Sequence, residues 1–109
     1  RIVELLDLKL VQDQYTDKEI MCAYTSDLLS DVMGNGPEEA VLITIQAHKN
    51  TVAVAVLKDS PAIIICNNRP IPGDMIMSAK DEGIAILVSE ENQFTVSGRL
   101  YSLLEQKRP

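Results

Sequence analysis

The sequence predicts an α/β fold in which helices cover both faces of a mostly parallel sheet of roughly four or five strands, a three-layer arrangement. Apolar runs rich in Val and Ile at 41–45, 62–66 and 84–88 are typical of buried strands. Helical patterns separate these runs along the chain, and consecutive parallel strands need such crossovers. A chain of 109 residues has room for one hydrophobic core, so we expect residues 1–109 to form a single domain.

The composition excludes several classes of partner. The chain carries 10 Lys and Arg against 16 Asp and Glu, a net charge of −6, so its field repels nucleic acid and we expect none as a partner. Its apolar runs are far shorter than the roughly 20 residues of a membrane span, so no membrane partner is expected. Cys22 and Cys66 lie outside any metal-ligand spacing, and no basic and apolar leader opens the sequence. We therefore expect a cytoplasmic protein with two buried, reduced thiols.

The first part of the chain predicts two short elements and a strand. Residues 2–6 fit a helical turn or two, and residues 8–11 form a short alternating segment. A polar loop over 12–18 follows. Residues 20–24 are apolar at every position, which predicts a strand buried largely on both faces.

A helix is expected next. Thr25 or Ser26 can cap its N-terminus, and Asp27 places a negative charge in its first turn. The glycines and the proline of 34–37 end it. Its apolar residues recur at helical spacing: Leu28, Leu29, Val32 and Met33.

The middle of the chain predicts a strand, a helix and a second strand. Residues 41–45 and 62–66 are the two strands. The segment 51–57 between them is ambiguous, because its valines favour a strand whereas its alanines and its position favour a crossover helix. We expect the helix, with Asn50 as its N-cap.

The last third predicts a helix, a strand and a helix. Residues 73–82 form the first helix, and Gly83 stands where a helix end needs a left-handed residue. A strand over 84–88 follows, and Asn92 is expected to cap the final helix. That helix has an apolar face wide enough to pack on the sheet and on a neighbour. Its apolar residues are Phe94, Val96, Leu100, Tyr101, Leu103 and Leu104.

Polar side chains follow the predicted strands at their carboxyl ends, where ligands bind in parallel α/β sheets. Four exit loops would form one rim: 25–27, 46–50, 67–70 and 89–92. The helix expected after Asn50 offers unpaired N–H groups that suit a phosphate or carboxylate. Lys49 and Arg69 add two cations, which is enough for one anion. The expected ligand-binding residues are Ser26, Asp27, Thr44, Gln46, His48, Asn50, Asn68 and Arg69.

Catalysis and metal binding find little support in the sequence. His48 is the one histidine, and it could contact a ligand, titrate as a switch near neutral pH, or simply be solvated. Asp27 and Asp31 lie four residues apart and could hold a divalent cation, although helix capping explains Asp27 more simply. We predict no metal site and no cofactor. Four methionines are interpreted as core fillers, the last with an alternative role at an interface: Met21, Met33, Met75 and Met77.

Three segments resemble the small DRTGG domain family, and together they cover nearly the whole chain. They are 23–33 (AYTSDLLSDVM), 43–50 (ITIQAHKN) with 52–55 (VAVA), and 79–87 (AKDEGIAIL). The resemblance is to stand-alone bacterial members encoded near iron-only hydrogenase genes, and the family is similar to the N-terminal domain of HPr kinase/phosphorylase. DRTGG domains also occur inside regulated pyrophosphatases and beside phosphate acetyltransferase modules. The resemblance therefore implies a regulatory or assembly role, often at a dimer contact, with a kinase or hydrogenase-related partner.

The sequence departs from the family at the motif that names it. No Asp-Arg-Thr-Gly-Gly string is present, and Cys66-Asn67-Asn68-Arg69-Pro70 stands where many members carry a threonine and paired glycines. Glycines permit close backbone approach to a ligand, so their absence argues against a phosphate cradle in this loop. Asparagine tolerates a left-handed backbone, so the turn itself can persist.

Three functions remain open, and one is favoured. We expect a non-catalytic regulatory or adaptor domain that forms a homodimer and senses a small anionic ligand or nucleotide for a partner enzyme or kinase. The alternative is a phosphate-transfer or enzyme component that uses His48. The third is a purely structural assembly unit.

Overall fold

The computed structural model describes residues 2–106, and its elements follow the predicted order of helices and strands. They are α1 (Ile2–Leu5), β1 (Lys9–Gln12), β2 (Ala23–Thr25), α2 (Leu29–Asn35), β3 (Val41–Thr44), α3 (Lys49–Leu57), β4 (Ala62–Ile65), α4 (Gly73–Glu82), β5 (Ala85–Val88) and α5 (Gln93–Gln106). The ambiguous segment 51–57 lies within α3, so the helical interpretation is confirmed. None of the helices within 2–106 is long and apolar enough to cross a membrane.

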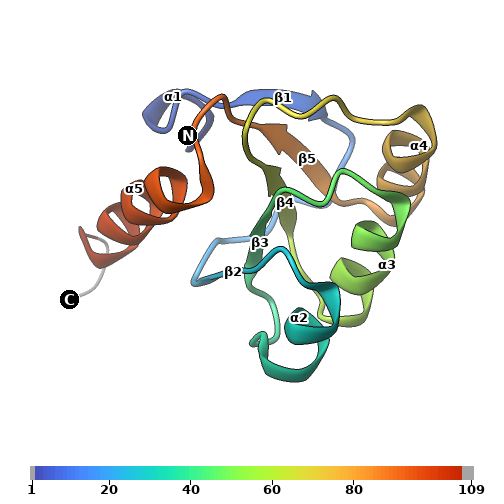
Figure 1. The fold of residues 1–109 in the computed structure, drawn as a ribbon, viewed down its shortest axis with the longest axis horizontal. Coiled ribbons are helices and arrows are strands. Elements are labelled where there is room, and N and C mark those ends of the chain that lie inside the picture. The colour runs from blue at the N-terminus through green and yellow to red at the C-terminus, as the bar shows by residue number, and fades with distance from the viewer. Residues whose placement is uncertain (1, 107–109) are drawn as a thin grey trace.

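The sheet has five strands in the order β1-β5-β4-β3-β2, and the mostly parallel α/β fold is confirmed. Strands β2 to β5 are parallel to one another, whereas β1 pairs with β5 in the antiparallel sense. Because each crossover from β2 to β5 moves one place in the same direction, right-handed connections put α2, α3 and α4 on the same face. The long helix α5, with α1 beside it, covers the opposite face (Figure 1).

Alternate side chains of the central strands fill two cores, one on each face of the sheet. Strands β3, β4 and β5 are buried along their full length, so residues one position apart enter different cores. The core under α5 includes Val41, Ile43, Ile64, Leu87, Val96 and Leu100. The core under α2, α3 and α4 includes Leu42, Val52, Ile63, Ile65, Met75 and Ile86.

The strand predicted over 20–24 is wrong in extent and in burial. The observed strand β2 covers only Ala23–Thr25, and none of its residues is fully buried. It pairs with β3 alone and therefore forms an edge of the sheet. Residues before it form no regular structure, and Met21 is 63% exposed. The apolar run marked a β-segment, but it carried no information on whether a second strand would cover its outer side.

The start of α2 also differs from the prediction. The helix begins at Leu29 and has Leu28 as its N-cap, without a side-chain cap. The Ser26 hydroxyl instead accepts a hydrogen bond from the Leu28 amide, at 3.2 Å, in the turn before the helix. Asp27 therefore precedes the first turn, and Asp31 is the acidic residue within it. A short side chain that can cap a helix can equally stabilise a turn ahead of it.

The C-terminal end of α4 and the N-terminal end of α5 are as predicted. Gly83 follows α4 with φ of 70°, the left-handed conformation that glycine adopts without strain. The Asn92 side chain accepts a hydrogen bond from the Thr95 amide at 2.9 Å and so caps α5.

Most of the methionines are not core residues. Met75 of α4 is fully buried, as predicted, but Met21, Met33 and Met77 are 63%, 40% and 58% exposed. The interpretation as core fillers is wrong for these three, because each lies at an edge or on the outer side of a short helix. The prediction of two buried thiols is confirmed for Cys66 and wrong for Cys22, which is only half-buried; both thiols are free.

Candidate functional site

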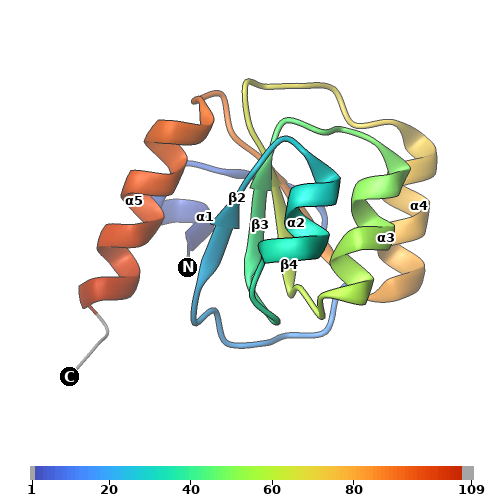
Figure 2. The ribbon, with the colours of Figure 1, turned by 60° about the horizontal axis from the view of Figure 1, so that its bottom comes forward.

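The carboxyl ends of four parallel strands lie along one edge of the sheet, as the sequence predicted. In Figure 2 the connections from these strands to α2, α3, α4 and α5 run along the top of the molecule. Backbone bonds hold these loops in place: the Ser26 amide donates to the Ile43 carbonyl at the end of β3, at 3.1 Å, and the Asn68 amide donates to the Ser89 carbonyl of the β5–α5 loop, at 2.7 Å. We call this surface the carboxyl edge. It is a rim of loops on a rigid sheet.

The β3–α3 loop is organised by two buried threonines. The Thr44 hydroxyl accepts from the Gln46 amide at 3.1 Å, and the Thr51 hydroxyl donates to the Gln46 carbonyl at 2.7 Å. Both threonines are fully buried. Gln46 donates from Nε2 to the Asp27 carbonyl at 2.7 Å, which ties this loop to the β2–α2 connection. Thr44 therefore positions Gln46, while Gln46 and Asp27 lie nearer the surface.

His48 is the N-cap of α3, where the sequence predicted Asn50. Its Nδ1 accepts a hydrogen bond from the Asn50 amide at 3.0 Å, and the side chain is exposed. An acceptor Nδ1 carries no proton, so the neutral ring has its proton on Nε2. The prediction of Asn50 as cap is wrong because an imidazole two residues ahead supplies the same acceptor. Asn50 is exposed in the first turn and free to face a ligand.

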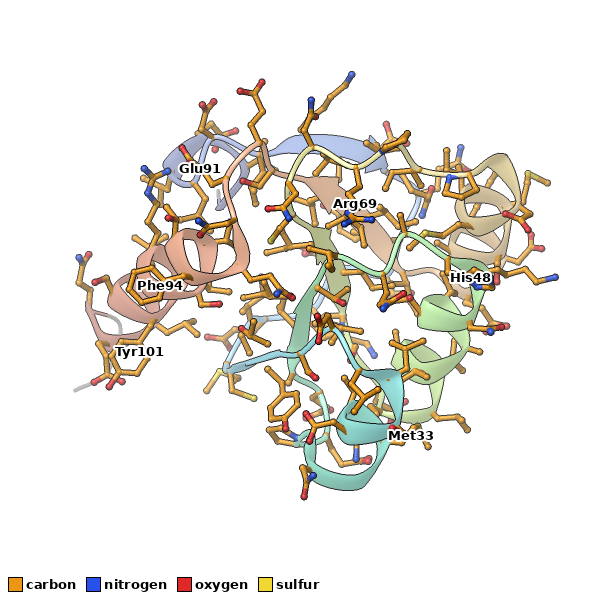
Figure 3. All side chains as sticks on the ribbon, viewed as in Figure 1. Met33, His48, Arg69, Glu91, Phe94 and Tyr101 are labelled. Carbon is orange, nitrogen blue, oxygen red and sulfur yellow. The ribbon has the colours of Figure 1, made fainter. Side chains whose placement is uncertain are left out.

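The β4–α4 loop holds the predicted left-handed turn. Asn67 and Asn68 have φ of 63° and 49°, which confirms the expectation that asparagine maintains this turn without glycine. The Asn67 amide donates to the Glu91 carbonyl at 2.9 Å, so the turn is fixed to the β5–α5 loop. Arg69 follows and is exposed. Figure 3 shows Arg69 over the end of β4 and His48 further along the edge, at the start of α3.

The predicted acidic pair does not form a cation site. Asp27 precedes α2, whereas Asp31 accepts hydrogen bonds from the Tyr24 hydroxyl at 2.8 Å and from Asn35 Nδ2 at 2.9 Å. The bond from Tyr24, followed by those from Asn35 and Ser26, lowers the pKa of Asp31, and the same contact raises the pKa of Tyr24. Within residues 2–106, His, Cys, Asp and Glu form no group of three or more that could hold a metal ion.

A hollow lies at the other edge of the sheet, and the sequence did not predict it. It has a volume of about 680 Å³ and is bounded by α1, the C-terminal half of α5, segment 15–20 and the first residues of β4 and β5. Helix α5 packs mainly on β2 and β3, which leaves this space beside it. The signal was present in Leu103 and Leu104, two apolar residues of α5 that remain only half-buried. None of the predicted site residues lines the hollow.

The fold and the rim define an α/β domain of the DRTGG-like class. The structure matches the DRTGG region of a crystal structure described as the CBS and DRTGG domains of the regulatory region of Clostridium perfringens pyrophosphatase, complexed with its activator diadenosine tetraphosphate. The TM-score is 0.75 at 14% sequence identity, and the match covers 91% of this chain and 44% of the other. The predicted DRTGG-like fold is therefore confirmed.

Sequence comparison adds distant relatives. HPr kinase/phosphorylase of Streptococcus uberis is 28% identical over 122 residues, which cover 96% of this chain and 39% of that enzyme. The same enzyme of Streptococcus pyogenes serotype M5 is 35% identical over 48 residues, 44% of this chain and 16% of the relative. No known protein-family profile matches the sequence. The chain thus spans about two fifths or less of these curated relatives, and their names do not support the expected hydrogenase association.

Proposed function

We propose that this chain is a regulatory domain that binds a small anionic ligand, a nucleotide, at its carboxyl edge and transmits its presence to a partner enzyme or kinase. The observation that carries the proposal is that four strand-end loops lie along one edge of the sheet, with Arg69 exposed among them. Such rims are where ligands bind in open α/β sheets. DRTGG domains occur in a regulatory region whose crystal structure contains a dinucleotide activator, which supports a ligand of this class.

Different residues of the rim would bind different parts of a nucleotide. Arg69 and Lys49 are exposed cations that would pair with phosphate oxygens. Asn50 and Asn68 would donate amide N–H groups, and Ser26, Gln46 and Asp27 would accept from sugar hydroxyls or a base edge. Thr44 would act indirectly by holding Gln46. Because His48 and Arg69 stand at separate places on the edge (Figure 3), a ligand that touches both is larger than a single phosphate, as a nucleotide is.

We further propose that the domain works as a homodimer. The support is the exposure of two aromatic side chains on α5, Phe94 and Tyr101, at 87% and 66%. Exposed aromatic residues on an ordered helix are typical of protein–protein interfaces. The dimer is independent of the ligand site, because Tyr101 and His48 lie at opposite ends of the molecule in Figure 3.

A titration followed by two-dimensional amide NMR tests the ligand site. Diadenosine tetraphosphate, ATP and inorganic phosphate are added separately to the full chain. We expect a nucleotide to shift amides of 46–50 and 67–69, with weaker shifts from phosphate alone. Arg69→Ala should weaken binding about tenfold or more, because a hydrogen-bonded charge pair contributes about 1.5–3 kcal/mol. Lys80→Ala removes an exposed cation from the last turn of α4 and is the matched control.

Two results would overturn the proposal. The first is the absence of shifts at both loops with all three compounds up to millimolar concentration. The second is equal weakening by Arg69→Ala and Lys80→Ala, which would mean that net charge alone governs binding. Unchanged complex formation with a partner protein in Gln46→Ala, His48→Ala and Asn50→Ala would then favour the purely structural assembly unit.

The capping geometry argues against the alternative of phosphate transfer by His48. While Nδ1 accepts the Asn50 amide, the proton of the neutral ring is on Nε2, and neither nitrogen offers a free lone pair to a phosphoryl group. Phosphorylation would require the cap to break. We therefore expect no incorporation of labelled phosphate from ATP under native conditions, whereas incorporation that is abolished by His48→Ala would establish the alternative.

A further inference from the structure

The hollow at the amino ends of the parallel strands has a floor made by two alanines. Ala62 and Ala85 are the first residues of β4 and β5, and they pair directly across the two strands. Both are buried, and both line the hollow of about 680 Å³. Two residues further along each strand, the side chains in the same core are the larger Ile64 and Leu87. The hollow therefore exists because two small side chains stand side by side where β4 and β5 begin.

The walls of the hollow are mainly aliphatic. They come from α1, β1, α5 and the segment before β2, and include Val3, Leu10, Ile20, Leu100, Leu103 and Leu104. Tyr15 is the one aromatic side chain among the described residues that line the hollow. A planar aromatic ligand would therefore find little to stack on, whereas an alkyl chain would meet aliphatic groups on several sides. Small-molecule sites are typically concave, mostly apolar and about 300–1,000 Å³ in volume, and the hollow has these properties.

Segment 13–22, which joins β1 to β2, borders the hollow on its open side. Figure 2 shows this segment in light blue along the bottom of the molecule, below the starts of the parallel strands. Two backbone hydrogen bonds anchor it: the Thr16 amide donates to the Gly83 carbonyl at 3.0 Å, and the Val41 amide donates to the Cys22 carbonyl at 2.9 Å. The residues between these anchors are therefore held at the mouth of the hollow.

The mouth carries more negative than positive charge. Asp17, Lys18 and Glu19 are exposed and line the hollow. Within residues 2–106, none of these three side chains takes part in a hydrogen bond or an ion pair. Two carboxylates against one ammonium group favour a ligand whose polar end is cationic and donates hydrogen bonds, and they disfavour a carboxylate at that place.

We infer that the hollow is a binding site for a small aliphatic amine, whose alkyl part lies against Ala62 and Ala85 and whose ammonium group pairs with Asp17 and Glu19. The alkyl part supplies most of the affinity, because each buried methylene improves binding roughly fourfold. The ammonium group adds only a few-fold, since its partners are exposed to water. The site is at the opposite edge from the carboxyl edge, so it does not rest on the function proposed above.

A comparison of ligands by amide NMR tests the class of ligand. Octylamine, hexylamine and octanoate are added separately to the full chain. We expect octylamine to shift amides of 15–20 and 103–104, and hexylamine to bind at least about tenfold more weakly because it buries two fewer methylenes. Octanoate should bind about three- to tenfold more weakly than octylamine. Octanoate binding as tightly as octylamine would overturn the assigned class, and no shifts with octylamine up to millimolar concentration would overturn the site.

Filling the floor tests where the ligand lies. Ala85→Leu should weaken octylamine binding at least about tenfold, because the added side chain occupies the space of several ligand methylenes. Ala62→Leu is the equivalent change on β4, and Leu104→Gln makes the half-buried wall on α5 polar in case neither filled variant folds by circular dichroism. Leu57→Gln is the matched control on α3, outside the hollow. Unchanged affinity in a folded variant of the hollow would overturn the site.

Neutralising the mouth tests the position of the ammonium group. Asp17→Asn/Glu19→Gln should abolish the preference for octylamine over octanoate. Asp74→Asn/Asp81→Asn changes the net charge equally on exposed positions of α4 and should leave that preference intact. Equal effects of the two double variants would overturn the pairing at the mouth, because net charge alone would then govern the preference. Nucleotide shifts at 46–50 and 67–69 judge the carboxyl edge separately, whatever octylamine does.

Discussion

The two faces of the sheet bury equally apolar strands but are covered very differently. Three helices, α2, α3 and α4, pack over one face. The core beneath them contains buried residues from each of these helices and from β3, β4 and β5. The other face has α5 and the single turn of α1, and a hollow of about 680 Å³ remains beside them. A sequential run of crossovers puts all of its helices on one side, so this difference follows from the strand order.

The two regions therefore differ in how firmly their surfaces are held. At the carboxyl edge, hydrogen bonds join the loops in two pairs, β2–α2 with β3–α3 and β4–α4 with β5–α5, above fully buried strands. The α5 side is loosely covered, exposes aromatic residues and is suited to contact with another protein. The β4–α4 loop is joined to the start of α5, because the Asn67 amide donates to the carbonyl of Glu91 in the β5–α5 loop.

Two adjacent residues of β5 provide the strongest test of whether the two faces of the sheet are packed differently. Ile86 enters the core under α4 and is fully buried, whereas Leu87 enters the opposite core and lines the hollow. We expect Ile86→Ala to lower the free energy of unfolding by about 4 kcal/mol and Leu87→Ala by only about 2–3 kcal/mol, because the space beside Leu87 is already partly empty. Urea denaturation of both variants measures the difference. Equal losses would show that the two faces are packed to the same density.

The glycine that ends α2 tests the close backbone contact at the end of this helix. A Cβ at Gly36 would lie 2.7 Å from the Val32 carbonyl oxygen, a backbone atom that cannot move without distorting the helix. Gly36→Ala should therefore lower the free energy of unfolding by about 2 kcal/mol. Gly34→Ala is the control, because it lies within the same helix with open space around it and should raise the stability by about 0.5–1 kcal/mol. Thermal unfolding that ranks the two variants in the opposite order would refute the close contact.

Much of the fold could be predicted because the three central strands are buried along their full length and rich in Val and Ile. The alternation of these runs with helical segments specified parallel strands, and it resolved 51–57 as a helix despite its valines. The edge of the sheet was not predictable in the same way. Residues 20–24 have the composition of a buried strand, but only Ala23 and Tyr24 of this run lie in β2, and β2 is at the edge of the sheet without a neighbour on its outer side.

The candidate site could be located by its loops but not in its details. The rule that ligands bind at the carboxyl ends of parallel strands placed Gln46, Asn68 and Arg69 on one edge. Which residue caps α3 depends on how the chain leaves β3, and that is a matter of backbone geometry rather than of residue type. The exposed rings of Phe94 and Tyr101 likewise follow from the tertiary orientation of α5, since the helical pattern alone distributes apolar residues on both sides.

The two cysteines differ in burial, so their reactivity compares the core with the edge of the sheet. Burial under the α5 face raises the pKa of the Cys66 thiol to about 11, so the reactive thiolate is scarce at pH 8, whereas Cys22 is half-buried near the edge strand. We expect Ellman's reagent to modify one thiol readily in the native protein and the second only after denaturation. Cys22→Ser should abolish the fast reaction. Rapid modification of Cys66 in that variant would show that the α5 face opens frequently.

The smallest expected effect concerns Tyr24 and Asp31, which connect the edge strand to α2. The Tyr24 hydroxyl bond lowers the pKa of Asp31, so the carboxylate stabilises the fold above the pKa it has in the unfolded chain and loses this contribution as the pH falls through its folded value. Tyr24→Phe should raise the pKa of Asp31 towards its ordinary value and make the stability less dependent on pH in the acidic range. NMR titration of the Asp31 carboxyl carbon measures the shift, with Tyr15→Phe as the control. An unchanged pKa in Tyr24→Phe would mean that Asn35 and Ser26 alone hold the carboxylate, and that the edge strand is joined to α2 only through the chain itself.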